Sequence, residues 1–464
     1  MQKLILKLKS LIPQRLRNFY HLLIAIGANL YYRNPSRKLF VIGVTGTDGK
    51  TTTVNLIYHL LKTAGKKVSM ISTVKAIIGE EEYHLGFHVT TPDPREIQKF
   101  ISLAALAGSE YLILETTSHA LDQFRVRGVN FRMGVLTNIT SEHLDYHKNY
   151  ENYLQSKAKL FKKTALAILN ADDPSFAKLK SEVKGRVLSY GIKKSADVMA
   201  IHIRHEALET RFDVTFSQAE VLAANQWGQE DLKYGNEFEL GDEKYLEYPI
   251  RSNLLGEFNI NNILAAIACV LKLNLSPQEI MEGIQSFMPP QGRMERVETG
   301  RDFEVMIDFA HTPGAFEKVL PFVKSITRGR LVHVFGAAGL RDFAKRPKMG
   351  AISAQYADLI VLTAEDPRTE DVNQIMSEIA SGAKKGQFKE VSVAAFEKSE
   401  KGQLFLIPDR QDAIEFAVRK LAQRDDLIFI SGKGHETSMC LGHQEFPWSE
   451  RKAVVEALKE RKDF

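Results

Sequence analysis

Val41-Ile-Gly-Val-Thr-Gly-Thr-Asp-Gly-Lys50-Thr51-Thr52-Thr53 is the stretch that decides the fold of this chain. Its first residues are apolar, partly β-branched and uncharged, which predicts a buried strand, and apolar residues recur at helical spacing over 54–61. A glycine turn between a strand and a helix forms a phosphate cradle, because backbone N–H groups and the helix N-terminus face the anion. Lys50 adds a positive charge, and a threonine hydroxyl can ligate Mg²⁺. The stretch therefore predicts a nucleotide-binding loop.

The glycines of this loop depart from the strict G-x-x-x-x-G-K-[ST] pattern. Val44 stands at the first glycine position, and Gly43, Gly46 and Gly49 supply the flexibility instead. A glycine turn before an ordinary helix is the structural alternative, and the Lys-Thr-Thr that follows the turn argues against it.

Composition indicates an ordinary globular protein, with 44% hydrophobic and 26% charged residues. A length of 464 residues predicts two or three domains. The net charge of +5 comes without an arginine-rich tract or a basic–aromatic array, which argues against a nucleic-acid partner. The two cysteines, Cys269 and Cys440, fall in no disulfide or metal-ligand pattern, so a reducing compartment fits.

Residues 1–38 interleave lysine and arginine with apolar residues. The apolar run over 22–28 is shorter than the roughly 20 residues that span a bilayer, and no small-x-small cleavage site supports a signal peptide. We expect a basic amphipathic segment. Two placements stay open, on an anionic membrane surface or packed against the rest of the protein.

From Leu39 to about Gln291 strands and helices alternate, which predicts an α/β domain around a mostly parallel sheet. The strand over 111–114 ends directly in Glu115. Ligands of such sheets bind beyond the carboxyl ends of the strands, so Glu115 is placed to meet a metal or a phosphate. A surface glutamate at a strand end is the alternative.

Two further residue types in this domain suggest chemistry. His143 and His147 are four apart and would share a helix face, but they do not form H-E-x-x-H and have no cysteine nearby, which favours magnesium over zinc. A capping or core histidine stays open. Lys157 borders an apolar helix face, where burial lowers a lysine pKa and frees the amine to react. Periodicity alone favours a snorkelling lysine at this position.

From roughly Arg293 the βα pattern resumes after the Pro- and Gly-containing linker 288–292. Four strands end in polar loops, which places charged residues along one edge of a sheet and predicts a binding site there. In the preceding domain, Asn259 and Asn262 open a helix, and either could cap it or read an adenine edge.

Many motifs in one order give the chain its family resemblance. It resembles the Mur ligases, most closely the MurE type, from about Val41 to the end. The matching stretches are Thr45-Gly-Thr-Asp-Gly-Lys-Thr-Thr-Thr53, Thr90-Thr-Pro-Asp-Pro94, Glu115-Thr-Thr-Ser-His-Ala-Leu-Asp-Gln-Phe-Arg125, Thr137-Asn-Ile-Thr-Ser-Glu-His-Leu-Asp-Tyr-His147, Ser156-Lys-Ala-Lys-Leu-Phe161, Gly292-Arg-Met-Glu295, Asp308-Phe-Ala-His-Thr-Pro313, Gly339-Leu-Arg-Asp342, Lys345-Arg-Pro347 and Gly432-Lys-Gly-His-Glu436.

This resemblance implies an α/β fold with two domains after the basic segment over 1–38. These are a central phosphate-loop ATPase domain with a mostly parallel sheet over 39–292, and a Rossmann-like C-terminal Mur ligase domain over 293–464.

The resemblance also implies roles for single residues. The ATP-binding residues would be Gly46, Thr47, Gly49, Lys50, Thr51, Thr52, Asn259, Asn262, Arg293 and Asp308. Two magnesium ions would be held by Thr51, Glu115, His143 and a carbamylated Lys157, and the catalytic residues would be Lys50, Lys157 and His143. The muramyl-dipeptide would meet Thr90, Thr91, Thr117, Gln123 and Arg125. The incoming amino acid would meet Arg341, Asp366, Arg368, Gly432 and Glu436.

The implied activity is ATP-dependent amide-bond formation in peptidoglycan biosynthesis, and so in cell shape and division. The D-Glu carboxylate of a muramoyl-L-Ala-D-Glu precursor would become an acyl phosphate, which the amine of the amino acid attacks. The C-terminal domain is expected to close and exclude water. The resemblance further implies a cytoplasmic monomer. Residues 1–38, which lie outside the resemblance, suggest peripheral contact at the inner membrane face.

Departures from the family pattern keep alternatives open. Asp48 replaces the usual loop asparagine and Thr117 a serine, and Glu365-Asp-Pro-Arg368 replaces Asp-Asn-Pro-Arg. The retained Arg368 favours diaminopimelate, while Asp366 leaves lysine open. The early phosphate loop predicts that the usual N-terminal uridine-diphosphate-binding domain is missing, so the acceptor could be lipid-linked. A poly-amino-acid or cyanophycin-type ligase and a catalytically silent nucleotide-binding scaffold are the other candidates.

Overall fold

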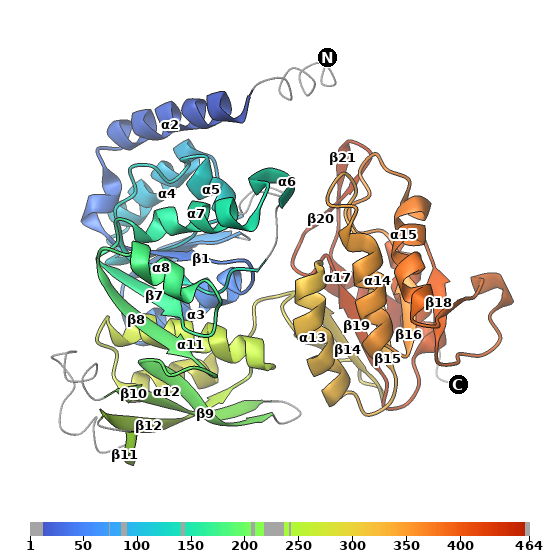
Figure 1. The fold of residues 1–464 in the computed structure, drawn as a ribbon. Helices are drawn as coiled ribbons and strands as arrows, with labels where there is room; N and C mark the ends of the chain where they lie inside the picture. The colour runs from blue at the N-terminus through green and yellow to red at the C-terminus, as the bar shows by residue number, and fades with distance from the viewer. Residues whose placement is uncertain are drawn as a thin grey trace. The chain divides into compact units, whose positions relative to one another are not determined.

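A computed structural model of the protein describes residues 13–73, 75–84, 91–140, 144–205, 209–217, 236–240 and 243–459. The chain divides into two compact units, Met1–Met288 and Pro289–Phe464, which are coloured blue to yellow and yellow to red in Figure 1. The domain boundaries at 38/39 and 292/293 stay predictions.

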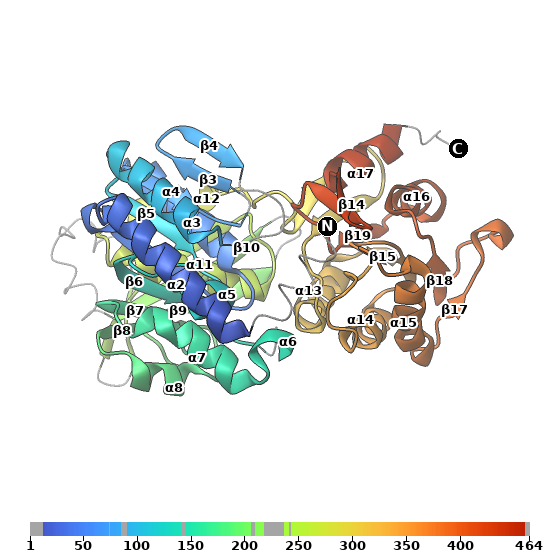
Figure 2. The same cartoon turned by 90° about the horizontal axis from the view of Figure 1, so that it is seen from above.

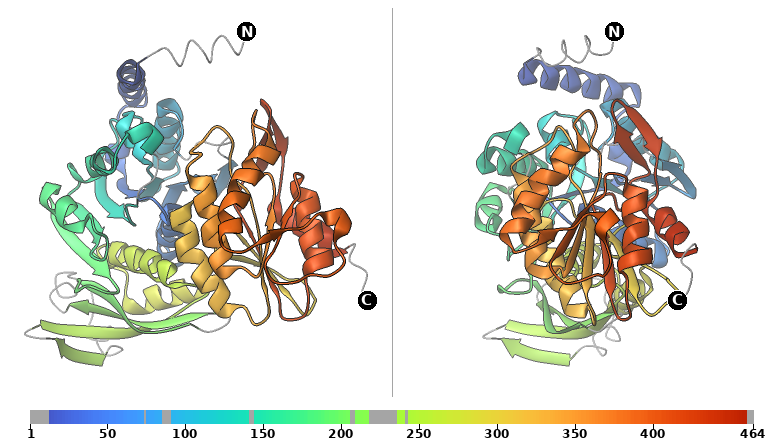
Figure 3. Two further views of the ribbon diagram at one scale, coloured as in Figure 1. Left: turned by 45° about the vertical axis from the view of Figure 1, so that its right-hand side comes forward. Right: turned by 90° about the vertical axis from the view of Figure 1, so that its right-hand side faces the viewer.

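The first unit is built on a twelve-stranded sheet in the order β11-β12-β10-β9-β8-β7-β6-β1-β5-β2-β3-β4. Its pairs from β9 to β2 are parallel, and those at both edges are antiparallel. The antiparallel strands β9 to β12 extend one end of the sheet (Figure 3). The strands are β1 (Phe40–Thr45), β2 (Val68–Ile71), β3 (Lys75–Ile78), β4 (Glu81–His84), β5 (Tyr111–Glu115), β6 (Phe131–Leu136), β7 (Leu166–Asn170), β8 (Arg186–Gly191), β9 (Val198–His205), β10 (Thr210–Ser217), β11 (Asn236–Leu240) and β12 (Glu243–Ser252).

Helices cover both faces of this sheet (Figure 1). The helical elements are α2 (Gln14–Tyr31), η1 (Pro35–Lys38), α3 (Lys50–Thr63), α4 (Pro94–Leu106), α5 (Ser118–Asp122), α6 (Leu144–His147), α7 (Tyr150–Phe161), α8 (Phe176–Glu182), α11 (Glu257–Leu271) and α12 (Pro277–Ser286). Alternate residues of β1 enter two cores. Ile42 and Val44 pack with α3 and α11, and Val41 packs with α4 and α7.

The second unit has a seven-stranded sheet in the order β13-β14-β19-β15-β16-β18-β17. All its pairs are parallel except β13 with β14. Its strands, with the separate hairpin β20–β21, are β13 (Glu295–Val297), β14 (Glu304–Asp308), β15 (Leu331–Phe335), β16 (Leu359–Leu362), β17 (Lys389–Glu390), β18 (Gln403–Leu406), β19 (Leu427–Ser431), β20 (Ser438–Leu441) and β21 (Gln444–Pro447). Its helical elements are α13 (Pro313–Ile326), α14 (Lys345–Tyr356), α15 (Val372–Lys385), η2 (Val393–Ala395), α16 (Arg410–Phe416), η3 (Ala417–Leu421) and α17 (Glu450–Lys459).

These elements confirm the α/β expectation and both mostly parallel sheets. The predicted phosphate loop lies between the central strand β1 and α3. The packing alternative for the N-terminal segment is confirmed for α2, which lies along α4 (Figure 2).

Candidate active site

The phosphate loop joins β1 to α3 through two closely packed glycines. Gly49 has a φ of +81°, the left-handed region that favours glycine, and a Cβ added there would lie 2.1 Å from Asn262 Oδ1. A Cβ added at Gly46 would lie 1.7 Å from Thr137 Oγ1. Side chains of Asn262 and Thr137 therefore pack tightly against the loop at these two glycines.

Hydrogen bonds from the loop after β6 fix the tip of the phosphate loop. The Asp48 amide donates to Asn138 Oδ1 at 3.0 Å, and Thr137 Oγ1 donates to the Asp48 carbonyl oxygen at 2.6 Å. Both bonds use the backbone of Asp48, so they do not depend on the asparagine-to-aspartate departure at this position.

Two lysines converge on one carbonyl of the loop. Lys50 Nζ donates to the carbonyl oxygen of Gly46 at 3.1 Å and to that of Thr47 at 2.8 Å. Lys157 Nζ, from α7, donates to the same Gly46 oxygen at 2.5 Å and lies over the Tyr153 ring. Lys157 is 1% exposed, so the snorkelling interpretation is wrong. Periodicity misplaced it because the phosphate loop, far away in sequence, covers this side of α7.

A buried carboxylate lies beside the helix that follows the loop. Glu115 accepts hydrogen bonds from Thr51 Oγ1 at 3.1 Å and Thr73 Oγ1 at 2.8 Å. It is 1% exposed, so the surface alternative is wrong. Hydroxyl and carboxylate oxygens are ligands that Mg²⁺ prefers, and the group therefore fits such an ion.

Of the two predicted histidines, His143 lies outside the described residues. His147 is buried, and its ring nitrogens lie 3.0 Å from Ser118 Oγ and 3.3 Å from Ser156 Oγ. This arrangement supports the core-histidine alternative for His147.

Of the two asparagines of α11, Asn262 lies against the phosphate loop and Asn259 is hydrogen-bonded to Asn262. Asn262 Nδ2 donates to Asn259 Oδ1 at 3.0 Å, and Asn259 Nδ2 donates to the Leu255 carbonyl oxygen. The N-cap of this helix is Gly256, so neither asparagine occupies the capping position. Both are buried.

Four of the predicted acceptor-binding residues form one hydrogen-bonded group. Thr91 and Thr117 have hydroxyl oxygens 3.1 Å apart, and Arg125 Nη1 donates to the Thr91 carbonyl oxygen at 3.1 Å. Arg125 Nε also donates to Gln123 Oε1 at 2.8 Å. The fifth residue, Thr90, lies outside the described residues.

In the second unit, Asp308 fixes the turn that carries Arg293. Its carboxylate accepts from the Met294 and Ala310 amides at 2.8 and 2.7 Å. The Arg293 guanidinium lies 4.5 Å from the centre of the Phe309 ring. These two predicted residues are therefore neighbours at the carboxyl end of β14.

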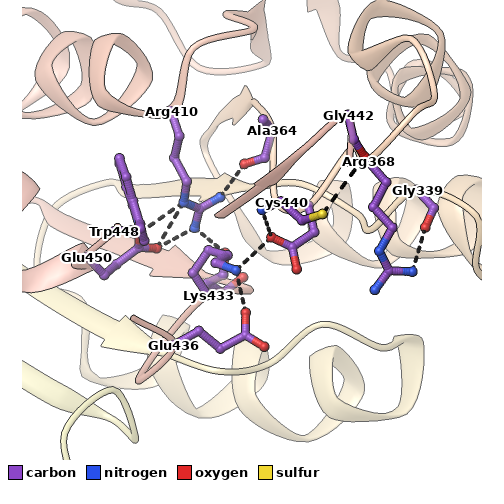
Figure 4. Close-up of polar contacts among 12 residues, drawn as sticks. Gly339, Ala364, Arg368, Arg410, Lys433, Glu436, Cys440, Gly442, Trp448 and Glu450 are labelled. Carbon is purple, nitrogen blue, oxygen red and sulfur yellow. Dashed lines mark hydrogen bonds and ion pairs between the residues drawn. The ribbon is translucent and has the colours of Figure 1, made fainter. Parts of the chain in front are cut away.

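The predicted amino-acid site gathers around a buried lysine (Figure 4). Lys433 Nζ donates to Asp366 Oδ1 at 2.8 Å and to Glu436 Oε2 at 2.5 Å. Burial lowers the pKa of Lys433, but the two carboxylates outweigh burial and raise it above its ordinary value. Lys433 therefore stays charged and offsets the negative charge of Asp366.

The three other predicted residues of this site, Arg341, Arg368 and Gly432, lie in loops that follow strands. Arg368 adopts a φ of +55°, and its Nη1 donates to the Gly339 carbonyl oxygen at 3.2 Å. Arg341 is exposed on the turn after β15. Gly432 has a φ of +112°, and its missing Cβ makes room for the Glu365 side chain. A Cβ added at this position would lie only 3.2 Å from Glu365 Oε2.

Sequence reasoning assigned no role to three buried residues with ionisable side chains beneath this site, Glu365, Arg410 and Glu450. Burial raises the pKa of Glu365 to about 7. Arg410 donates to the carbonyl oxygens of Ala364 and Ser431, both at 2.8 Å, and forms a fully buried ion pair with Glu450 (Figure 4). Arg410 thus ties together the two strand ends that carry the site. Neither Arg410 nor Glu450 belongs to a motif that marks it in advance.

Comparison with known proteins follows the same division of the chain. The Mur ligase middle domain model matches residues 44–270, and the Mur ligase glutamate ligase domain model matches residues 292–434. A UDP-N-acetylmuramoyl-L-alanyl-D-glutamate–2,6-diaminopimelate ligase of Syntrophomonas wolfei is 36% identical over 94% of this chain and 81% of its own length. A UDP-N-acetylmuramyl-tripeptide synthetase of Borreliella afzelii is 38% identical over 93% and 79%.

Solved structures agree with these matches. A UDP-N-acetylmuramoyl-L-alanyl-D-glutamate–2,6-diaminopimelate ligase is 26% identical with a TM-score of 0.57, over 91% of this chain and 78% of that one. The MurF ligase of Thermotoga maritima in complex with ADP shares the fold, with a TM-score of 0.63 at 17% identity over 94% and 83%. Since the matches extend through both units, the chain belongs to the Mur ligase family.

Proposed function

We propose that this chain is an ATP-dependent ligase of the MurE type that joins meso-diaminopimelate to the D-Glu of a muramoyl-L-Ala-D-Glu precursor. The γ-phosphoryl group of ATP passes to the D-Glu carboxylate, which leaves ADP and an acyl phosphate. The amine of diaminopimelate then attacks the acyl carbon, the amide forms and phosphate leaves. The observation that carries the proposal is the convergence of Lys50 and Lys157 on the Gly46 carbonyl, beside the Thr51–Glu115 pair.

Lys50 binds the phosphates of ATP in this proposal, with Gly46, Thr47, Gly49, Thr51 and Thr52. Its ammonium already lies over the loop, so it offsets the charge that gathers during phosphoryl transfer. We also propose that Asn259 and Asn262 contact the adenine, and that Arg293 and Asp308 contact the phosphate and ribose.

Two magnesium ions would be held by Thr51, Glu115, His143 and a carbamylated Lys157. Bound there, they would neutralise charge on the transferring phosphoryl group. Two observations support this assignment: the hydroxyl–carboxylate group at Glu115, and the complete burial of Lys157 at the loop.

The acceptor dipeptide would contact Thr90, Thr91, Thr117, Gln123 and Arg125. The amino acid would contact Arg341, Asp366, Arg368, Gly432 and Glu436. Because Lys433 already offsets the charge of Asp366, this aspartate does not demand a second amine on the substrate. Arg368 then favours the distal carboxylate of diaminopimelate over lysine.

A matrix assay of acceptors and amino acids, read as phosphate release and amide product, tests the proposal. We expect turnover only with both substrates present, and its loss in Lys50→Ala. Phosphate release that needs neither acceptor nor amine would refute the ligase, and a full absence of turnover across the matrix would favour the scaffold. Product formed on a poly-amino-acid acceptor alone would identify the other ligase class.

We further propose that the enzyme works as a cytoplasmic monomer in peripheral contact with the inner face of the membrane. The acceptor can then be UDP-linked or lipid-linked, and the same matrix distinguishes these two carriers.

A further inference from the structure

Helix α2 is amphipathic in the opposite sense to a helix that covers a protein core. Its inward face is polar. Asn18 Nδ2 donates to Asp122 Oδ2 at 3.3 Å, Gln14 Nε2 donates to Tyr146 OH at 3.0 Å, and Asn29 Nδ2 donates to Asn34 Oδ1 at 2.7 Å. Ala25 and Ala28 are buried on this face, and Leu22 and Ile24 are half-buried.

The outward face of α2 carries the apolar side chains. Of the fourteen exposed large apolar side chains among the described residues, seven lie on this one helix. Their spacing at three, four and seven residues makes one continuous stripe along the helix. The stripe, called the outer stripe below, consists of Leu16 (59% exposed), Phe19 (55%), Tyr20 (58%), Leu23 (53%), Ile26 (42%), Leu30 (63%) and Tyr31 (80%).

A hollow runs beside the outer stripe. It has a volume of about 450 Å³ and is lined by Tyr20, Ile24, Gly27, Ala28, Tyr31, Tyr32 and Arg95. Tyrosines favour the boundary between hydrocarbon and lipid headgroups, because their rings are apolar and their hydroxyls stay wet.

The charged residues of segment 1–38, which contains α2, all have one sign. Residues 1–38 contain eight lysines and arginines and no aspartate or glutamate, whereas the remaining residues hold 54 cationic and 57 acidic side chains. Arg17, Arg33, Arg37 and Lys38 are exposed on or next to the helix. Such a cluster attracts an anionic bilayer.

No helix among the described residues is long and apolar enough to cross a membrane. An apolar stripe flanked by cations instead fits a helix that lies in the plane of the lipid headgroups. We propose that the outer stripe of α2 docks on the surface of an anionic lipid bilayer, with its apolar side chains inserted between the lipids.

The outer stripe would provide the peripheral membrane contact of the proposed function, and the biological purpose of the docking therefore rests on that function. Tyr146 OH accepts from Gln14 of α2 and from Gln123 Nε2 at 3.3 Å, and it donates to Asp122 Oδ2 at 2.9 Å. The inward face of α2 is thus bonded to the group that contains the predicted acceptor residues. Docking would hold that group close to the lipid headgroups.

Vesicle co-sedimentation of the full chain tests the docking surface. We expect binding to vesicles with about 30 mol % phosphatidylglycerol, at least about tenfold weaker binding to pure phosphatidylcholine, and loss of binding near 0.5 M salt. Phe19→Ser with Leu23→Ser should bind the anionic vesicles at least about tenfold less. The matched control, Phe446→Ser with Val393→Ser, changes two exposed apolar side chains of the second unit and should bind as the unaltered chain does.

Equal binding by both double variants would overturn the proposal, as would equal binding to neutral and anionic vesicles. The proposal would also be overturned if light scattering showed the unaltered chain to be a dimer and the Phe19/Leu23 variant a monomer. The outer stripe would then be a self-association surface. Turnover of a water-soluble acceptor should stay within about twofold in both variants, since none of the four altered side chains is among the proposed substrate-binding residues. Vesicle binding without any turnover would refute the ligase and leave the docking surface standing.

Discussion

The buried ion pair between Arg410 and Glu450 gives the sharpest test of how the proposed amino-acid site is built. Both side chains are fully buried, and Arg410 Nε lies 3.0 and 3.2 Å from the two Glu450 oxygens. Burial lowers the pKa of Arg410, but the Glu450 carboxylate outweighs that effect and raises it. Glu450→Gln therefore leaves a guanidinium that stays charged in an apolar interior without its counter-charge.

Breaking one side of a buried pair costs about 3–5 kcal/mol. For a unit the size of Pro289–Phe464, each kcal/mol lowers Tm by about 2–4 °C, so we expect the transition of this unit to fall by roughly 6–20 °C in calorimetry. The matched control is Glu456→Gln on the same helix α17, where the side chain is exposed and 3.9 Å from Lys452. It should shift stability by no more than about 0.5 kcal/mol.

Enzyme kinetics distinguish an effect of the ion pair on stability from an effect on the positioning of the site residues. Arg410 holds the carbonyls that precede Glu365 and Gly432, so the KM for the amino acid should rise at least about tenfold in Glu450→Gln. The KM for ATP should change by less than about threefold, since most of the proposed ATP-binding residues belong to the other unit and only Arg293 and Asp308 lie in this one. Arg410→Met with Glu450→Leu should recover most of the stability but not the KM. A Tm shift below about 2 °C in Glu450→Gln would refute the reasoning, and so would an unchanged amino-acid KM in the double variant.

Three more outcomes follow from single residues. Lys157→Arg keeps the charge but forms no carbamate, so kcat should fall at least about 100-fold by phosphate release, and near-normal turnover would exclude a carbamate role. Glu365→Gln should stabilise the protein by roughly 3 kcal/mol at pH 8 and by little near pH 4.5 in denaturant titrations. The stability difference has this sign because the pKa of the buried Glu365 carboxyl is about 7. Ionisation of Glu365 therefore destabilises the fold increasingly as the pH rises from 4.5 to 7, and in full above pH 7. A stability difference that does not change with pH would contradict this reasoning. Gly49→Ala should weaken ATP binding at least about tenfold in calorimetric titration, because its Cβ would collide with Asn262, whereas Gly314→Ala, which faces open space, should not.

Local patterns predicted the framework of the fold well. The strand and helix around the phosphate loop, and the strand that ends in Glu115, lie where apolar runs and glycine placed them. These signals are reliable because strand burial and loop geometry depend on residues close together in the chain.

Contacts between distant segments were beyond the reach of such patterns. Lys157 borders an apolar stripe in the sequence, and only the phosphate loop 111 residues away explains its burial. Arg410 pairs with Glu450, which lies 40 residues further along the chain, and no local sequence pattern in either segment predicts the pair. The inverted faces of α2 were hidden too, because amphipathicity indicates two faces without stating which of them packs inward.

The polar bonds on the inner side of α2 also limit how this part of the chain can change in length. Each inserted residue turns a helix by about 100°, which would rotate Gln14 and Asn18 away from Tyr146 and Asp122 and press leucines against them. Substitutions among apolar residues on the outer stripe leave those bonds intact. In natural variants of this helix, the apolar residues of the outer stripe should therefore vary in identity, while the number of residues in the segment stays constant. The number of residues between Gln14 and β1 is then a better signature of the helix than any single amino acid in it.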